Sequence, residues 1–124
     1  MPTIRFQENI LAGGTVANAL AGNQFEFLGA PSVVQVFAIN DISPGAGLFG
    51  VSELEVFFGQ EIQLPQSVLG DNANAGEFPK VPDDELVNDV GAPGDRLVIR
   101  LTETGGALAV IVNGMVKITP IPMR

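Results

Sequence analysis

The densest group of side chains able to perform chemistry is acidic and lies between residues 83 and 89. Its carboxylates are Asp83, Asp84, Glu85 and Asp89. Oxygen ligands gathered in this way are those that Ca²⁺ prefers, so a calcium-dependent binding loop is one hypothesis. The alternative is one helical turn that starts at Pro82, because proline and acidic residues both suit a helix N-terminus. We favour this turn or a solvated loop, and we predict no metal and no other cofactor.

Two further carboxylates, Glu53 and Glu55, are spaced to share one face of a strand. Paired carboxylates are the minimum for glycoside hydrolysis. Carbohydrate clefts usually present Trp or Tyr to the sugar rings, and this chain has neither. The pair is therefore interpreted as an exposed acidic strand face. The segment 71–77 has the outline of an EF-hand loop, but Ala73 and Ala75 occupy positions where ligands are required.

Cysteine and histidine are both absent from the chain. Their absence excludes disulfides, thiolate or imidazole zinc sites, thiol nucleophiles and histidine acid–base catalysis. Residues 50–54, Gly-Val-Ser-Glu-Leu, lack the final glycine of a nucleophile elbow, and no histidine is present to act as its base. The sequence therefore predicts a protein that is not an enzyme.

The length of 124 residues suits a single domain over residues 1–124. Six basic residues stand against fourteen acidic ones, which gives a net charge of −8, and the basic residues are scattered. Nucleic-acid binding requires clustered cations to replace phosphate counterions, so direct contact with a genome is not expected. No apolar run approaches the roughly 20 residues needed to cross a bilayer, so no membrane contact is expected either.

Short apolar runs alternate with turn residues, including 15 Gly and 9 Pro. This pattern predicts an all-β fold, an antiparallel two-sheet sandwich built as a single jelly roll of about eight strands. An immunoglobulin-like sandwich is the main rival, although its Cys-Trp-Cys core is missing. The strands are expected at residues 3–7, 15–19, 24–27, 32–39, 53–58, 61–64, 96–102 and 108–119.

Strand phase follows from the alternation of apolar and polar residues. Leu54, Val56 and Phe58 are predicted to face the core. Asn113-Gly114 poses a choice, because Asn-Gly is a strong hairpin signal. A continuous strand gives cleaner alternation than a hairpin would, so we predict one long strand through these two residues.

Surplus apolar residues remain once the core is assigned. Phe57, Ile111 and Met115 are predicted to point away from the core, and Leu48 and Phe49 lie in a glycine-rich loop. Outward apolar residues often mark a subunit contact. These five residues are therefore the predicted interface of a homo-oligomer.

The order of turn and strand segments resembles small single-domain virion proteins of bacteriophages, of the jelly-roll or β-sandwich coat and decoration type. A Val/Phe-rich strand over residues 32–39 is flanked by five further segments that carry the resemblance, namely NILAGGTV (9–16), LAGNQFEF (20–27), VPDDE (81–85), GDRLVIR (94–100) and VKITP (116–120). The resemblance implies a structural, non-catalytic subunit of a symmetric shell or spike, made in the host cytoplasm and located in the virion.

Many coat proteins of this type carry a basic arm that faces the genome, and this chain lacks one. An outer-surface, vertex or decoration position is therefore favoured. The expected partners are further copies of the chain, in a cyclic homo-oligomer such as a trimer or pentamer, and other capsid proteins. The alternative function is a non-catalytic ligand-binding β-sandwich module that is Ca²⁺-dependent through the loop at residues 83–89.

Overall fold

The computed structural model describes residues 3–42, 49–72, 74, 76–81 and 83–121. Within these ranges the chain forms eight strands and no helix. The strands are β1 (Thr3–Ile10), β2 (Thr15–Val16), β3 (Ser32–Asp41), β4 (Ser52–Phe58), β5 (Glu61–Val68), β6 (Glu85–Gly91), β7 (Leu97–Glu103) and β8 (Val110–Pro120).

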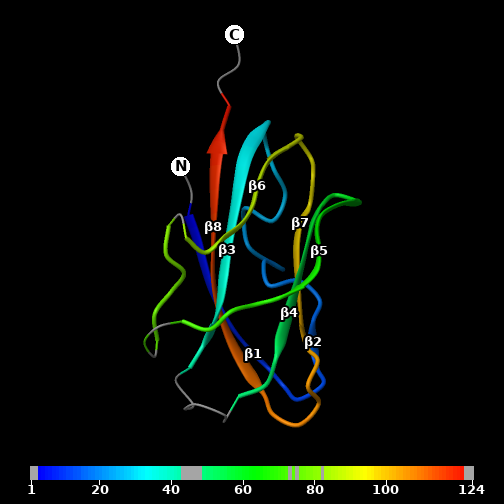
Figure 1. The fold of residues 1–124 in the computed structure, drawn as a ribbon. Helices are drawn as coiled ribbons and strands as arrows, with labels where there is room; N and C mark the ends of the chain where they lie inside the picture. The colour runs from blue at the N-terminus through cyan, green and yellow to red at the C-terminus, as the bar shows by residue number, and fades with distance from the viewer. Residues whose placement is uncertain (1–2, 43–48, 73, 75, 82, 122–124) are drawn as a thin grey trace.

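The strands form two antiparallel sheets that face each other as two layers (Figure 1). Sheet A has the order β1-β8-β3-β6, and sheet B has the order β2-β7-β4-β5. The strand pairs are nested along the chain: the first strand pairs with the last, the second with the seventh, the third with the sixth, and the two middle strands with each other. These pairs are β1–β8, β2–β7, β3–β6 and β4–β5. This nesting is the strand order of a single jelly roll. The predicted all-β sandwich of about eight strands is confirmed.

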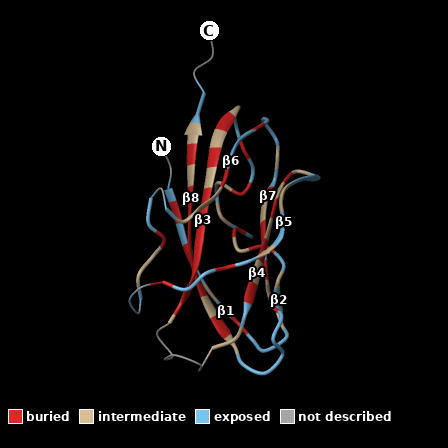
Figure 2. Ribbon diagram, in the orientation of Figure 1, coloured by how far each residue is buried: buried red, intermediate tan, exposed pale blue. Residues whose placement is uncertain are grey.

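The core fills the space between the sheets and is built by alternation along each strand (Figure 2). Leu54, Val56 and Phe58 of β4 are buried, and the residues between them are only partly buried. The predicted facing of this strand is therefore confirmed. From β3, the side chains of Val34 and Val36 enter the same core.

Strand β8 runs without a turn through Asn113-Gly114, as predicted. Gly114 pairs with Phe6 of β1, and a Cβ placed on Gly114 would lie 2.0 Å from Cζ of the Phe6 ring. Any side chain at this position would collide with the ring. Glycine is thus required here by the close approach of a neighbouring side chain, and the hairpin that Asn-Gly favours elsewhere does not form.

Three predicted elements differ in the structure. Residues 83 and 84 form a turn that leads into β6, so the helical turn predicted at residues 82–85 is wrong for its described part. Residues 24–27 contribute a single bridge between Phe27 and Arg96 instead of a strand. Strand β5 continues through Pro65, and it can do so because it is an edge strand where a missing N–H is tolerated.

Candidate assembly surface

The outer face of sheet B carries a row of apolar side chains across three neighbouring strands. Phe57 of β4 pairs with Val98 of β7 on one side and with Ile62 of β5 on the other. Ile62 is 57% exposed, while Phe57 and Val98 are partly buried. We call these three residues the apolar row. It ends at β5, the edge strand of the sheet.

Charged side chains border the apolar row. Glu55 and Arg100 are paired across β4 and β7 with Oε1 and Nη1 3.6 Å apart, and the Arg100 guanidinium lies 5.4 Å from the centre of the Phe57 ring. Glu53 lies farther along β4, opposite Thr102 and Val68. The two glutamates therefore lie along one sheet face with different cross-strand partners. They lie on the outer face, as the sequence predicted, but both are partly buried instead of fully exposed.

The outer face of sheet A is covered by the chain itself. Figure 1 shows the segment that connects β5 to β6 passing outside β3 and β8. Backbone hydrogen bonds begin this contact, since the Asn40 N–H donates to the Gly70 carbonyl at 2.8 Å and the Asn72 N–H donates to the Asn40 carbonyl at 2.9 Å. We call residues 69–81, apart from the undescribed positions 73 and 75, the cover segment.

Buried polar side chains hold the cover segment against sheet A. The carboxylate of Asp41 accepts a hydrogen bond from the Gly76 N–H at 2.8 Å. The Glu77 carbonyl accepts one from the side-chain amide of Asn72 at 3.0 Å and one from that of Asn113 at 3.1 Å. Asp41, Asn72 and Asn113 are all buried. Each of these bonds satisfies a polar group that burial would otherwise leave without a partner.

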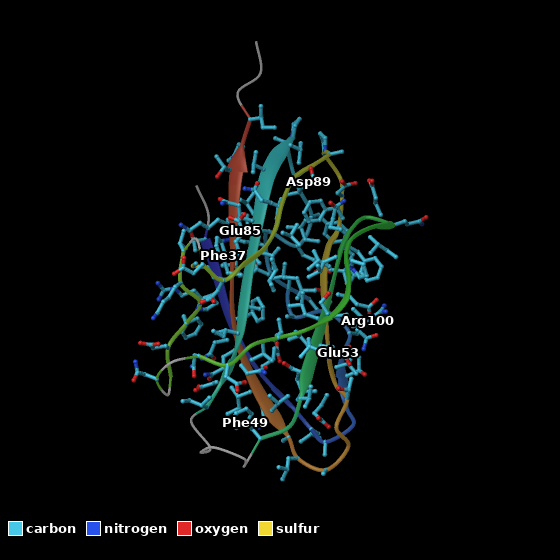
Figure 3. The ribbon with its side chains drawn as sticks, viewed as in Figure 1. Phe37, Phe49, Glu53, Glu85, Asp89 and Arg100 are labelled. Atoms are coloured by element: carbon cyan, nitrogen blue, oxygen red, sulfur yellow. The ribbon has the colours of Figure 1, made fainter. Side chains whose placement is uncertain are left out.

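The cover segment and sheet A together bury the apolar side chains on this face. Phe37 and Ile39 point away from the inter-sheet core but are 0% and 9% exposed. Met115 pairs with Phe37 on the neighbouring strand and is 6% exposed. Figure 3 places Phe37 and Arg100 on opposite outer sides of the sandwich, the first at the covered face and the second at the open one.

The predicted interface residues divide accordingly. Phe57 lies on an open outer face and Ile111 is partly buried on the outer side of β8. Met115 faces outward as predicted but is buried, so it offers no contact surface. Phe49 lies in a loop, as predicted, but it is partly buried there and packs against the core. Leu48 lies outside the described residues.

Two residues of the open face, Ile62 and Val98, were not predicted as interface residues. The alternation of apolar and polar residues in β5 and β7 indicates that these two side chains face outward. It does not indicate that they lie beside Phe57, because the order of strands in the sheet becomes known only from the fold. Once β4 lies between β7 and β5, both side chains fall beside Phe57.

The four carboxylates of the predicted acidic group, Asp83, Asp84, Glu85 and Asp89, do not come together in the structure. Asp84 accepts a hydrogen bond from the Lys80 N–H at 2.7 Å, and Glu85 accepts one from the Gln35 side-chain amide at 2.9 Å. Asp89 is exposed on β6 and binds the N–H of its neighbour Val90, while Asp83 is exposed in the preceding turn. Among the described residues, no three carboxylates come together in a way that would hold a metal ion.

Glu103 forms a site that sequence reasoning missed. Its side chain, 1% exposed at the end of β7, accepts four hydrogen bonds of 2.7–3.0 Å from the backbone N–H groups of Gly13, Val51, Gly105 and Gly106. The bond from Gly13, together with the other three, outweighs desolvation and lowers the pKa of Glu103 from 4.5 to about 2. The ionised carboxylate thus ties three loops together at one end of the sandwich.

A second buried carboxylate, Glu26, anchors the connection between β2 and β3. It pairs with Arg96, and it also accepts a hydrogen bond from the Gly22 N–H at 3.0 Å. The bond from the Arg96 side chain is the main cause that lowers the pKa of Glu26. Asn18 completes the contact by donating to the Leu97 carbonyl at 3.1 Å. Both carboxylates serve the architecture, since their acceptor sites are directed to the chain's own donors.

Comparisons of the chain with protein-family models, with curated proteins and with solved structures give no match. In the described part of the chain, no helix is long and apolar enough to span a bilayer.

Proposed function

We propose that this protein is a structural subunit of a virus particle, a capsid, vertex or decoration protein that self-associates through the outer face of sheet B. The observation that carries the proposal is the apolar row of Phe57, Val98 and Ile62, which no described segment covers and which ends at an edge strand. Burial of apolar surface is the main driving force of protein association.

Two further features support the proposal. The nested strand order agrees with the jelly roll that the resemblance to small phage coat and decoration proteins implies. The net charge of −8 favours an outer-surface position over one against the genome, because nucleic acid would repel an acidic subunit. Other capsid proteins are the second class of partner, and the virion is the location.

Cyclic assemblies such as trimers or pentamers suit a small subunit of this kind. A standard interface buries roughly 800 Å² on each partner, which is more than three side chains supply. The charged border of Glu53, Glu55 and Arg100 would therefore form the rim around the apolar row. The rim contributes complementarity, while the apolar row contributes most of the binding energy.

The substitution Phe57→Asp tests the proposal. We expect the wild-type chain to form a closed oligomer or a shell-sized particle. The variant should remain monomeric and folded, with a melting temperature only slightly lower because the Phe57 ring is partly buried in the single subunit. The measurement is solution mass by size-exclusion chromatography with light scattering. Concentration is followed by refractive index, since a chain without Trp, Tyr or Cys barely absorbs at 280 nm.

The control is Gln24→Asp, which adds the same charge at an exposed loop position outside the apolar row. It should assemble as the wild type does. If Phe57→Asp assembles normally, the outer face of sheet B is not the contact and the proposal is wrong.

A further inference from the structure

The cover segment leaves a hollow beside strands β1 and β8. It has a volume of about 630 Å³ and is lined by Thr3, Arg5, Phe78, Pro79, Val81, Met115 and Lys117. This volume lies within the range of clefts that bind small ligands, so it has room for a few side chains. Val81 is 50% exposed at its border. The hollow is thus apolar in part and open to a partner.

Two cations of the hollow have no ionic partner in the described part of the chain. Arg5 lies over the Phe78 ring, 5.7 Å from its centre, and Lys117 lies on β8 close by. Glu85 of β6 is hydrogen-bonded to Gln35, the cross-strand partner of Lys117. The chain has only six basic residues and a net charge of −8, so two unpaired cations at one hollow form a local positively charged patch.

An acidic and apolar projection lies on the opposite side of the molecule. Strands β4 and β5 are joined by Gly59-Gln60, and Figure 1 shows this hairpin extending beyond the rest of sheet B. Gly59 has a φ of +63°, which permits the tight turn. Directly after the turn, Glu61 and Ile62 are both exposed. Because successive strand residues point to opposite faces, the tip presents a carboxylate on one face and an aliphatic side chain on the other.

We propose that the β4–β5 hairpin tip of one copy inserts into the hollow of a second copy. Glu61 would pair with Arg5 and Lys117, while Ile62 would contact the apolar lining. This inference rests on the proposed self-association and names the surfaces that meet. The argument is complementarity, because the hollow offers unpaired cations with apolar walls and the tip offers the opposite charge with an apolar side chain.

The geometry also sets the type of assembly. Donor and acceptor are different surfaces on opposite sides of one subunit, so the contact is head-to-tail. Such heterologous contacts produce a ring when the rotation closes. A ring such as a trimer or pentamer is the closed outcome of this contact, and an open filament is the outcome when the rotation does not close.

Charge reversal tests this contact in the full chain. Arg5→Glu and Glu61→Arg should each weaken association by about tenfold or more. This fold-change corresponds to the lower end of the coupling energies known for close charge pairs across interfaces. The double variant should recover most of the loss, because the pair is restored with its signs exchanged. Asp89→Lys, an exposed reversal on β6, is the matched control and should leave association unchanged. Association is measured by light scattering against concentration, and melting curves verify that each variant is folded.

Ile62→Ser is a second variant that changes no charge and should also weaken association. If both reversals assemble normally while Phe57→Asp does not, the hairpin contact is wrong and the proposed function stands. If the double variant stays dissociated, the pairing of Arg5 with Glu61 is wrong. A wild-type chain that is monomeric at every concentration would overturn both proposals.

Discussion

The two sheets of the sandwich treat their outer faces differently. Sheet A has Phe37, Ile39 and Met115 on its outer side, and all three are buried; Ile39 and Met115 lie beside residues of the cover segment. Sheet B has its apolar row of three side chains on the outer side. Within the described residues the Arg100 guanidinium lies over the Phe57 ring, and the row stays partly exposed. Similar strand patterns thus lead to a face closed by the chain itself and to a face that stays partly exposed.

The covered face is distinguished by its buried polar anchors. Asp41, Asn72 and Asn113 are 2%, 6% and 0% exposed, and their side chains bond to the backbone or to one another across the covered face. The open face has no comparable set among the described residues, and its one ion pair, Glu55 with Arg100, is partly solvated. Buried amides beside an apolar patch therefore indicate that the chain covers the patch itself.

The largest expected effect separates the two faces by stability. Phe37→Ala should lower the free energy of unfolding by about 3–5 kcal/mol, as large-to-small substitutions do in a closed site. Phe57→Ala should lower it by only about 1 kcal/mol, because that ring is partly exposed in the single subunit. Urea unfolding followed by circular dichroism, at a concentration where the chain is monomeric, measures both. Equal losses would show that the two faces are equally closed.

A smaller effect concerns the anchoring of sheet B at Glu103. Its folded-state pKa is about 2, below the ordinary 4.5, so the ionised group stabilises the fold fully above about pH 4.5. The contribution is lost as the pH falls through this window towards 2. Glu103→Gln should lower the melting temperature at pH 7, and its curve should approach that of the wild type near pH 2. Parallel curves from pH 7 to pH 2 would contradict the role of the charge.

The smallest effect is expected at the open face. Glu55→Gln removes the ion pair with Arg100, whose side chain is 44% exposed. Exposed pairs of this kind contribute roughly 0–1 kcal/mol, and salt screens them further. The melting temperature in 0.5 M NaCl should therefore be nearly that of the wild type. A marked loss would mean that the open face is structurally closed after all.

The sequence predicted the sandwich and the phase of its central strands because alternation reports burial directly. Leu54, Val56 and Phe58 face the core, and β8 continues through Gly114, as their patterns indicate. Strand β6 was missed because Glu85 and Asp89 resemble a helix N-terminus. In the structure β6 is an edge strand whose seven residues mix three polar with three apolar side chains, so no clean alternation marks it.

The covered face was not predictable from local pattern. Met115 has the parity of an outward residue, and the outward assignment is correct for the sheet. Its burial depends on hydrogen bonds such as that between Asn113 and Glu77, which are 36 residues apart. No spacing in the sequence indicates such a partner. The sequence predicted Phe57 as part of the candidate surface. Ile62 and Val98 could be added only once the order of the strands in sheet B was known.

The central position of β8 in sheet A has a consequence for synthesis on the ribosome. Strands β1 and β3 both pair with β8, so neither can complete its pairing until residue 120 has emerged. The four strands of sheet B are all translated by residue 103. The nascent chain therefore carries apolar strands without their partners until translation is nearly complete, which exposes it to aggregation. The proposed contact at the hollow also requires β8, since Met115 and Lys117 of this strand line it.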